Sequence, residues 1–143
     1  AVFVDFAHTP DALRQVLSTL REISASSAGR ILCVFGCGGD RDPGKRGAMG
    51  AAAAELADEV FVTNDNPRGE NPAAIADAIC AGMERPSEVH VELDRRLAIR
   101  AALRAARSED VVLIAGKGHE STQTIGETQH VFDDVQVVQE EAL

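Results

Sequence analysis

Residues 30–62 read RILCVFGCGGDRDPGKRGAMGAAAAELADEVFV and contain the unit on which the fold is built. Arg30–Phe35 and Glu59–Thr63 are short apolar runs bounded by polar or glycine-rich turns, a pattern typical of buried β-strands. Lys45–Leu56, between them, has the length and composition of a helix. Strand, helix and strand in this order predict a βαβ unit, and such units build largely parallel sheets covered by helices on both faces.

The same alternation extends in both directions along the chain. Further strands are predicted at Val2–Phe6, Val89–Leu93 and Val111–Ala115, and further helices at Pro10–Ile23, Pro72–Met83 and Arg95–Ala106. Thr9, Asn71 and Asp94 stand where helix N-caps are expected.

The pattern changes after Ala115. Thr122–Ile125 and Gln129–Phe132 flank Gly126-Glu127 and predict a β-hairpin, and Asp134–Leu143 can form a short last helix. The predicted fold class is therefore α/β: a Rossmann-like, mostly parallel sheet with helices on both faces and a C-terminal β-hairpin.

Composition limits the function classes. A chain of 143 residues with 45% hydrophobic residues fits one globular domain with a real core. The net charge of −9 opposes binding to nucleic acid or to an anionic membrane surface, and no apolar run reaches membrane-spanning length. Three cysteines without paired CxxC motifs predict reduced thiols and a cytoplasmic location. The start on an apolar strand, Ala1–Val4, favours a cut at a domain boundary of a longer polypeptide, although a processed or engineered start gives the same beginning.

Charge, glycine and proline concentrate in the loops that follow four of the predicted strands. Ligands of open α/β sheets bind beyond the carboxyl ends of the strands, so these loops predict one shared site. The loops are DFAHTP (5–10), GCGGDRDPGKR (36–46), NDNPRGE (64–70) and GKGHE (116–120).

Each loop alone allows two interpretations. Arg41 suits a carboxylate but can equally belong to a salt-bridged turn, and the loop around it lacks the P-loop pattern for ATP phosphates. In Asp65-Asn66-Pro67-Arg68, the Asp65 carboxylate suits an ammonium group and the Arg68 guanidinium suits a carboxylate. Alternatively, Asp65 and Arg68 form a local ion pair with each other.

The remaining loops are equally open. After Gly116, Glu120 can hold a second ammonium. Asp5 suits ribose hydroxyls unless it caps the next helix, and capping by Thr9 would leave Asp5 and His8 free. The chain's two lysines, Lys45 and Lys117, are phosphate contacts or solvated charges.

Together the loops are far more specific. DFAHTPDAL, VFGCGGDRDPGKR, TNDNPRGENP, LIAGKGHE and the late Phe132–Asp134 resemble, in order and spacing, the C-terminal domain of Mur ligases. The resemblance covers essentially the whole chain and is strongest to the branch that adds meso-diaminopimelate to UDP-N-acetylmuramoyl-L-alanyl-D-glutamate. Enzymes of this family have an N-terminal domain for the uridine nucleotide and a central ATPase domain, and both would lie outside residues 1–143. The implied reaction uses ATP and Mg²⁺ and proceeds through an acyl phosphate.

The resemblance also implies roles for individual residues. Arg41 and Arg68 would hold carboxylates of diaminopimelate, Asp65 and Glu120 would face its amino groups, and Asn66, Pro67 and Gly116 would complete the site. Asp5 and His8 would approach ATP brought by the central domain. The resemblance assigns no metal ligand and no catalytic residue to this chain. Two alternatives remain at this point: a related ligase that adds L-lysine or another amino acid, and a non-catalytic α/β binding module.

Overall fold

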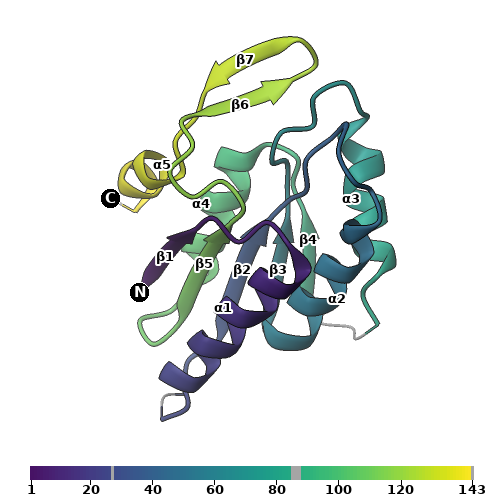
Figure 1. Cartoon of the computed structure of the whole chain (residues 1–143). Coiled ribbons are helices and arrows are strands. Elements are labelled where there is room, and N and C mark those ends of the chain that lie inside the picture. Colours follow the sequence, from purple (N-terminus) through teal and green to yellow (C-terminus); the bar gives the residue numbers. More distant parts are fainter. Residues whose placement is uncertain (27, 85–87, 143) are drawn as a thin grey trace.

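The computed structural model describes residues 1–26, 28–84 and 88–142 and shows a five-stranded sheet with helices on both faces (Figure 1). The strand order is β1-β5-β2-β3-β4, and every pairing in this sheet is parallel, as predicted. The strands are β1 (Val2–Asp5), β2 (Ile31–Phe35), β3 (Glu59–Val62), β4 (Glu88–Val91) and β5 (Val111–Ala115).

Two apolar cores lie on the two faces of the sheet. On one face pack α1 (Pro10–Ile23), α2 (Lys45–Leu56) and α3 (Pro72–Ala81), with fully buried side chains such as Leu17 and Ile79. On the other face pack α4 (Arg95–Ala105) and α5 (Asp134–Glu141), with Ile99 against strand residues such as Leu32. Burial on both faces explains why the central strands are apolar along their whole length.

Side-chain caps fix where three helices begin. Thr9 Oγ1 accepts from the Ala12 N–H at 3.2 Å, Asn71 Oδ1 from Ala73 at 2.9 Å, and Asp94 Oδ1 from Leu97 at 3.1 Å, which confirms the predicted helix starts. Helix ends are less well predicted. The helix expected to reach Met83 ends at Ala81, because the Gly82 N–H turns back to the Ile79 carbonyl at 3.2 Å. The last predicted helix also stops earlier, at Glu141, and Leu143 lies outside the described residues.

The hairpin forms as expected from β6 (Thr122–Ile125) and β7 (Thr128–Val131), which pair antiparallel in a separate two-stranded sheet. Gly126 supplies the left-handed turn conformation, with φ 62°. The hairpin does not extend the main sheet. It stands beyond the carboxyl ends of the strands (Figure 1), where Thr124 accepts from the Arg68 N–H at 3.0 Å. The hairpin thereby supports the loop that follows β3.

Candidate functional site

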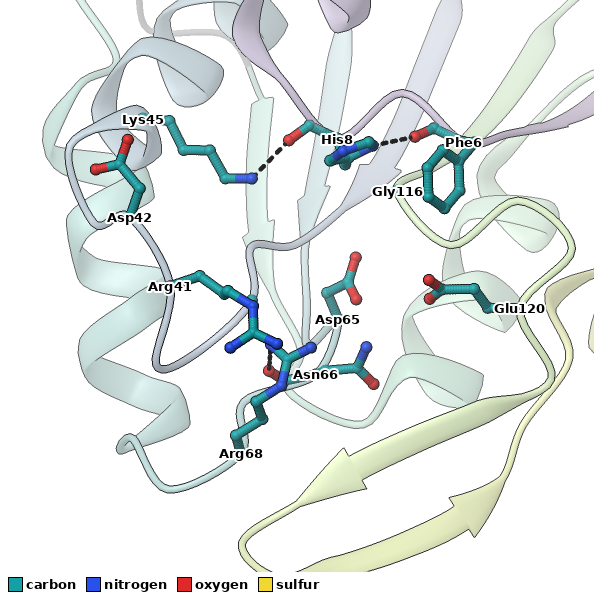
Figure 2. Close-up of a pocket in the computed structure, with 11 residues that line it drawn as sticks. Phe6, His8, Arg41, Asp42, Lys45, Asp65, Asn66, Arg68, Gly116 and Glu120 are labelled. Atoms are coloured by element: carbon teal, nitrogen blue, oxygen red, sulfur yellow. Dashed lines mark hydrogen bonds between the residues drawn. The ribbon is translucent and has the colours of Figure 1, made fainter.

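A pocket of about 400 Å³ lies at the carboxyl edge of the sheet, where four loops meet (Figure 2). The topology predicts this meeting, because the parallel strands β1, β2, β3 and β5 all end at this edge. The pocket is lined by Phe6, His8, Gly38, Arg41, Asp42, Lys45, Asp65, Asn66, Arg68, Gly116 and Glu120.

Of the predicted site residues, only Asp5 and Pro67 are outside this lining. Asp5 Oδ2 accepts from the Ala7 N–H at 2.8 Å, so one carboxylate oxygen shapes the turn that leaves β1. Pro67 is buried behind the pocket, and its carbonyl oxygen would lie 1.8 Å from a Cβ placed on Gly39. The loops after β2 and β3 can therefore approach this closely only with glycine at position 39.

The pocket carries both signs of charge. Its cations come from Arg41, Lys45 and Arg68, and its carboxylates from Asp42, Asp65 and Glu120. Figure 2 shows the guanidinium groups of Arg41 and Arg68 close together on one side of the pocket, with the carboxylate of Asp65 in the middle and that of Glu120 on the opposite side. Such a lining suits a zwitterion with several charged ends better than a simple anion or cation.

Arg68 is held in an unusual backbone conformation, with φ 51°. Its Nη1 donates to the Gly39 carbonyl at 2.9 Å and, at the limit of hydrogen bonding, to the Asn66 carbonyl at 3.5 Å. The alternative of a local ion pair with Asp65 is wrong for the described structure, since both of these acceptors are main-chain carbonyls. Backbone strain of this kind is typical of positions held by a functional site.

A partly buried ion pair ties the second and third loops together. Arg46, only 5% exposed, places Nη2 at 2.8 Å from Glu70 Oε1 and Nη1 at 2.9 Å from Oε2. The hydrogen bond from Arg46 and a second from the Asp40 N–H lower the pKa of Glu70 to about 2. Sequence reasoning found the loops but missed this bidentate bond, which joins residues 24 positions apart.

The hairpin and Lys117 fix the Asp65-Asn66 segment from behind. Gln123 Nε2 donates to the Asp65 carbonyl at 2.8 Å, and the Thr124 N–H donates to Asn66 Oδ1 at 2.9 Å. Lys117 is fully buried and donates to Asn66 Oδ1 at 3.3 Å, and its Nζ lies 3.5 Å from Glu120 Oε1. Both expectations for Lys117, a phosphate contact or a solvated charge, are therefore wrong: it is an internal support.

The other end of the pocket is formed by the first loop and the start of α2. Lys45 Nζ donates to the His8 carbonyl at 2.8 Å, and His8 Nδ1 lies 2.8 Å from the Phe6 carbonyl. The rings of Phe6 and His8 meet edge to face, with centroids 4.5 Å apart. One edge of His8 is thus fixed by its own loop, while its ring lines the pocket.

A group of three side chains able to hold a metal ion occurs at the opposite edge, where β3 and β4 begin. Glu59, Glu88 and His90 place ligand atoms within 4.8 Å of one another. Glu59 is already bonded to His90 at 2.8 Å and to Arg30 at 3.1 Å, so the cation of Arg30 occupies its second oxygen. Among the described residues, the three pocket carboxylates do not form a comparable group.

Comparison with known proteins identifies relatives along the whole chain. Residues 1–118 match the family model described as Mur ligase, glutamate ligase domain. UDP-N-acetylmuramoyl-L-alanyl-D-glutamate–2,6-diaminopimelate ligase of Xylella fastidiosa is 57% identical over 136 residues, which are 95% of this chain and 27% of the relative. The same enzyme of Coxiella burnetii is 53% identical over 94% of this chain and 27% of the relative. The chain thus spans about a quarter of the length of these relatives.

Solved structures agree with this relationship. A structure of UDP-N-acetylmuramoyl-L-alanyl-D-glutamate–2,6-diaminopimelate ligase matches with a TM-score of 0.92 and 45% identity, over 99% of this chain and 28% of that one. The bifunctional folylpolyglutamate synthase/dihydrofolate synthase of Yersinia pestis matches with a TM-score of 0.61 and 25% identity, over 80% of this chain and 25% of that one. Within the part of the chain that the structure describes, no helix is long and apolar enough to cross a membrane. The match of residues 1–118 to the family model and the identity to these relatives show that the chain belongs to the family of Mur ligase C-terminal domains.

Proposed function

We propose that this chain is the amino-acid-binding domain of an ATP-dependent ligase that adds meso-diaminopimelate to UDP-N-acetylmuramoyl-L-alanyl-D-glutamate in peptidoglycan synthesis. The observation that carries the proposal is a single pocket lined by two guanidinium groups, those of Arg41 and Arg68, and by the carboxylates of Asp65 and Glu120. Relatives at 53% to 57% identity carry the name of this ligase. An N-terminal nucleotide domain and a central ATPase domain would make up the rest of the enzyme.

Diaminopimelate has an amino and a carboxylate group at each end, and the pocket offers a partner for each kind of group. Arg41 and Arg68 bind carboxylates, because a guanidinium can donate two parallel hydrogen bonds to the two oxygens. Asp65 and Glu120 face the ammonium groups. Asn66 and Pro67 hold the loop in shape, and Gly116 leaves room beside Asp65, where a Cβ would lie 2.7 Å from Oδ2.

ATP and Mg²⁺ would be bound mainly by the central domain. This chain would contribute Asp5 and His8, which approach the nucleotide when the domains close, and closure would exclude water from the reaction. ATP phosphorylates a carboxylate of the nucleotide-linked peptide and leaves as ADP, and the neutral amine of the bound amino acid then attacks the acyl phosphate, forming the amide and releasing inorganic phosphate and a proton. The role of this chain is to orient that amine. The Yersinia relative was solved with AMPPNP and a manganese ion, which supports nucleotide and metal use in the family.

We further infer a cytoplasmic enzyme without nucleic-acid or membrane partners. The net charge of −9 supports the absence of polyanionic partners. The three cysteines are free thiols in the structure, which supports a reducing compartment.

Titration calorimetry of the chain with meso-diaminopimelate, L-lysine and ATP tests the proposal. We expect heat from diaminopimelate, much weaker binding of lysine, and no tight binding of ATP without the central domain. Tighter binding of lysine than of diaminopimelate would favour the lysine-adding alternative. An absence of binding by either amino acid to a chain with an intact melting transition would contradict the assignment of the pocket. ATP-dependent joining of diaminopimelate by the complete ligase is the matching activity test.

A further inference from the structure

Arg95, the first residue of α4, has a side chain with no exposed surface, and its guanidinium makes four hydrogen bonds. Two go to Asp134 at the start of α5: Nε to Oδ1 at 2.8 Å and Nη2 to Oδ2 at 2.7 Å. The other two go to main-chain carbonyls, from Nη1 to Asn64 at 2.9 Å and from Nη2 to Ala115 at 3.2 Å. One buried side chain thus joins two helices and two loops.

The two carbonyls belong to strand ends that do not touch each other. In the strand order β5-β2-β3, the end of β2 separates the end of β5 from that of β3. Asn64 directly precedes Asp65, and Ala115 directly precedes Gly116. The carboxylate of Asp65 lies against Gly116, since a Cβ there would meet Oδ2 at 2.7 Å. The distance between the ends of β3 and β5 therefore determines how closely the Asp65 side chain packs against Gly116.

We propose that Arg95, held by Asp134, is a positioning residue that fixes Asp65 relative to Gly116 and Glu120 in the amino-acid pocket. This inference rests on the proposed function for the identity of the ligand. Arg95 and Asp134 are outside the lining of the pocket and act through the main chain of Asn64 and Ala115.

The buried pair is not the only ion pair between α4 and α5 among the described residues. Arg96 and Arg100, on the same helix, already bind Glu141 of α5 at 2.7 Å and 2.6 Å, and Arg96 also pairs with Glu140. A buried ion pair is costly to desolvate, and an apolar pair of similar volume often packs at least as well. An apolar pair at positions 95 and 134 could not replace the hydrogen bonds that Arg95 donates to the main-chain carbonyls of Asn64 and Ala115.

Arg95 also places a positive charge below the acidic half of the pocket. Burial alone would lower the pKa of Arg95, but the hydrogen bonds to Asp134 raise it above its usual value, and the charges of Asp65 and Glu120 raise it further. The guanidinium therefore remains charged. It places a fixed positive charge beneath the carboxylates of Asp65 and Glu120.

The test replaces the pair by apolar residues, Arg95→Met with Asp134→Leu, so that packing is kept and the carbonyl contacts are lost. Arg95→Lys is the second variant, because an ammonium keeps the charge next to Asp134 without the planar fork that reaches both carbonyls. Arg96→Met is the matched control: it removes an α4–α5 ion pair one residue away without touching either strand end. The readouts are the melting temperature, amide hydrogen exchange, and the KM values of the complete ligase for diaminopimelate and for ATP.

We expect the double variant to remain folded, with a melting temperature lowered by the loss of two hydrogen bonds to buried carbonyls, and to exchange faster in segments 64–66 and 115–118. Its KM for diaminopimelate should rise roughly 10- to 100-fold, the scale of an ångström-sized misplacement, with the KM for ATP nearly unchanged. Arg95→Lys should recover part of the loss, and Arg96→Met should show neither effect. Unchanged exchange and KM in a folded double variant, or a loss of stability with both KM values unchanged, would overturn the inference. If the wild-type ligase does not use diaminopimelate, the proposed function fails, and the exchange comparison still decides the role of Arg95.

Discussion

Arg68 donates from Nη1 to the main-chain carbonyl of Gly39 at 2.9 Å, at the point where the loops after β2 and β3 meet. The bond fixes the direction of a long side chain that would otherwise sample many rotamers, and so lowers the entropy lost when a ligand binds. It also makes Arg68 partly structural, since its backbone is held at φ 51°. Any test of Arg68 in ligand recognition must therefore separate binding from loop stability.

The close contact between Gly39 and Pro67, where the two loops meet, predicts the effect of adding one methyl group at position 39. Gly39→Ala would place a Cβ 1.8 Å from the Pro67 carbonyl oxygen, so the two loops must separate. Overpacking of this kind costs about 1–3 kcal/mol, and the shift should also weaken amino-acid binding. Gly47→Ala is the control, because its Cβ would meet no atom closer than 3.6 Å and it lies inside α2. Urea unfolding of both variants checks the prediction, and equal stability of the two would refute it.

The bond between Arg46 and Glu70 predicts a dependence of stability on pH. The hydrogen bond from Arg46, followed by that from the Asp40 N–H, lowers the pKa of Glu70 from its ordinary value of 4.5 to about 2. A lowered pKa in the folded state gives stability that is present above pH 4.5 and is lost as the pH falls towards 2. Melting temperatures of wild type and Glu70→Gln should therefore differ near pH 6 and converge near pH 2. A difference independent of pH would show that the charge on Glu70 contributes nothing.

Burial predicts how the three cysteines react. It raises the pKa of Cys33 to about 12 and that of Cys37 to about 11, so both remain protonated and shielded near pH 8. Cys80 is only partly buried, and its pKa is raised mainly by burial as well. We expect iodoacetamide to modify Cys80 first in the folded chain, and Cys33 only after unfolding. Peptide mass mapping would contradict the packing of β2 if Cys33 reacted as fast as Cys80.

The sequence was sufficient for the order and type of the elements, because the signals involved are local. Apolar runs separated by capped helices define the βαβ order, and parallel strands bring the loops that follow them to one edge. The boundaries moved by one or two residues where a strand or helix ended in a loop. At α3, the backbone of Gly82 decided the end, which the apolar pattern does not reveal.

The supports of the site could not be predicted in the same way, because they join distant parts of the chain. Gln123 reaches the Asp65 carbonyl from 58 residues away, and Arg95 meets Asp134 across 39. Lys117 has the sequence context of an exposed loop lysine, but in the folded chain it is buried and donates to the Thr122 carbonyl of the hairpin. The sequence shows which residues carry charge, but the tertiary structure determines which charges face the ligand and which hold the loops.

In the proposed function, Arg68 recognises the carboxylate that distinguishes diaminopimelate from L-lysine. With lysine bound, Arg68 keeps its bond to Gly39 but faces no carboxylate, and a site that expects a polar partner can reject such an analogue by roughly 10⁴-fold. Arg68→Lys keeps the charge and loses the fork, so it should retain only part of the preference. Arg14→Ala, on the exposed face of α1, is the control for a surface arginine.

The decisive measurement is the ratio of kcat/KM for meso-diaminopimelate to kcat/KM for L-lysine, in the complete ligase carrying Arg68→Ala. A melting curve accompanies it, since loss of the bond to Gly39 should cost about 1 kcal/mol and affect both substrates alike. We expect the ratio to fall by at least about 100-fold, mainly through a higher KM for diaminopimelate. A ratio equal to that of wild type, with both efficiencies reduced to the same extent, would contradict this expectation and leave Arg68 as a structural residue of its loop.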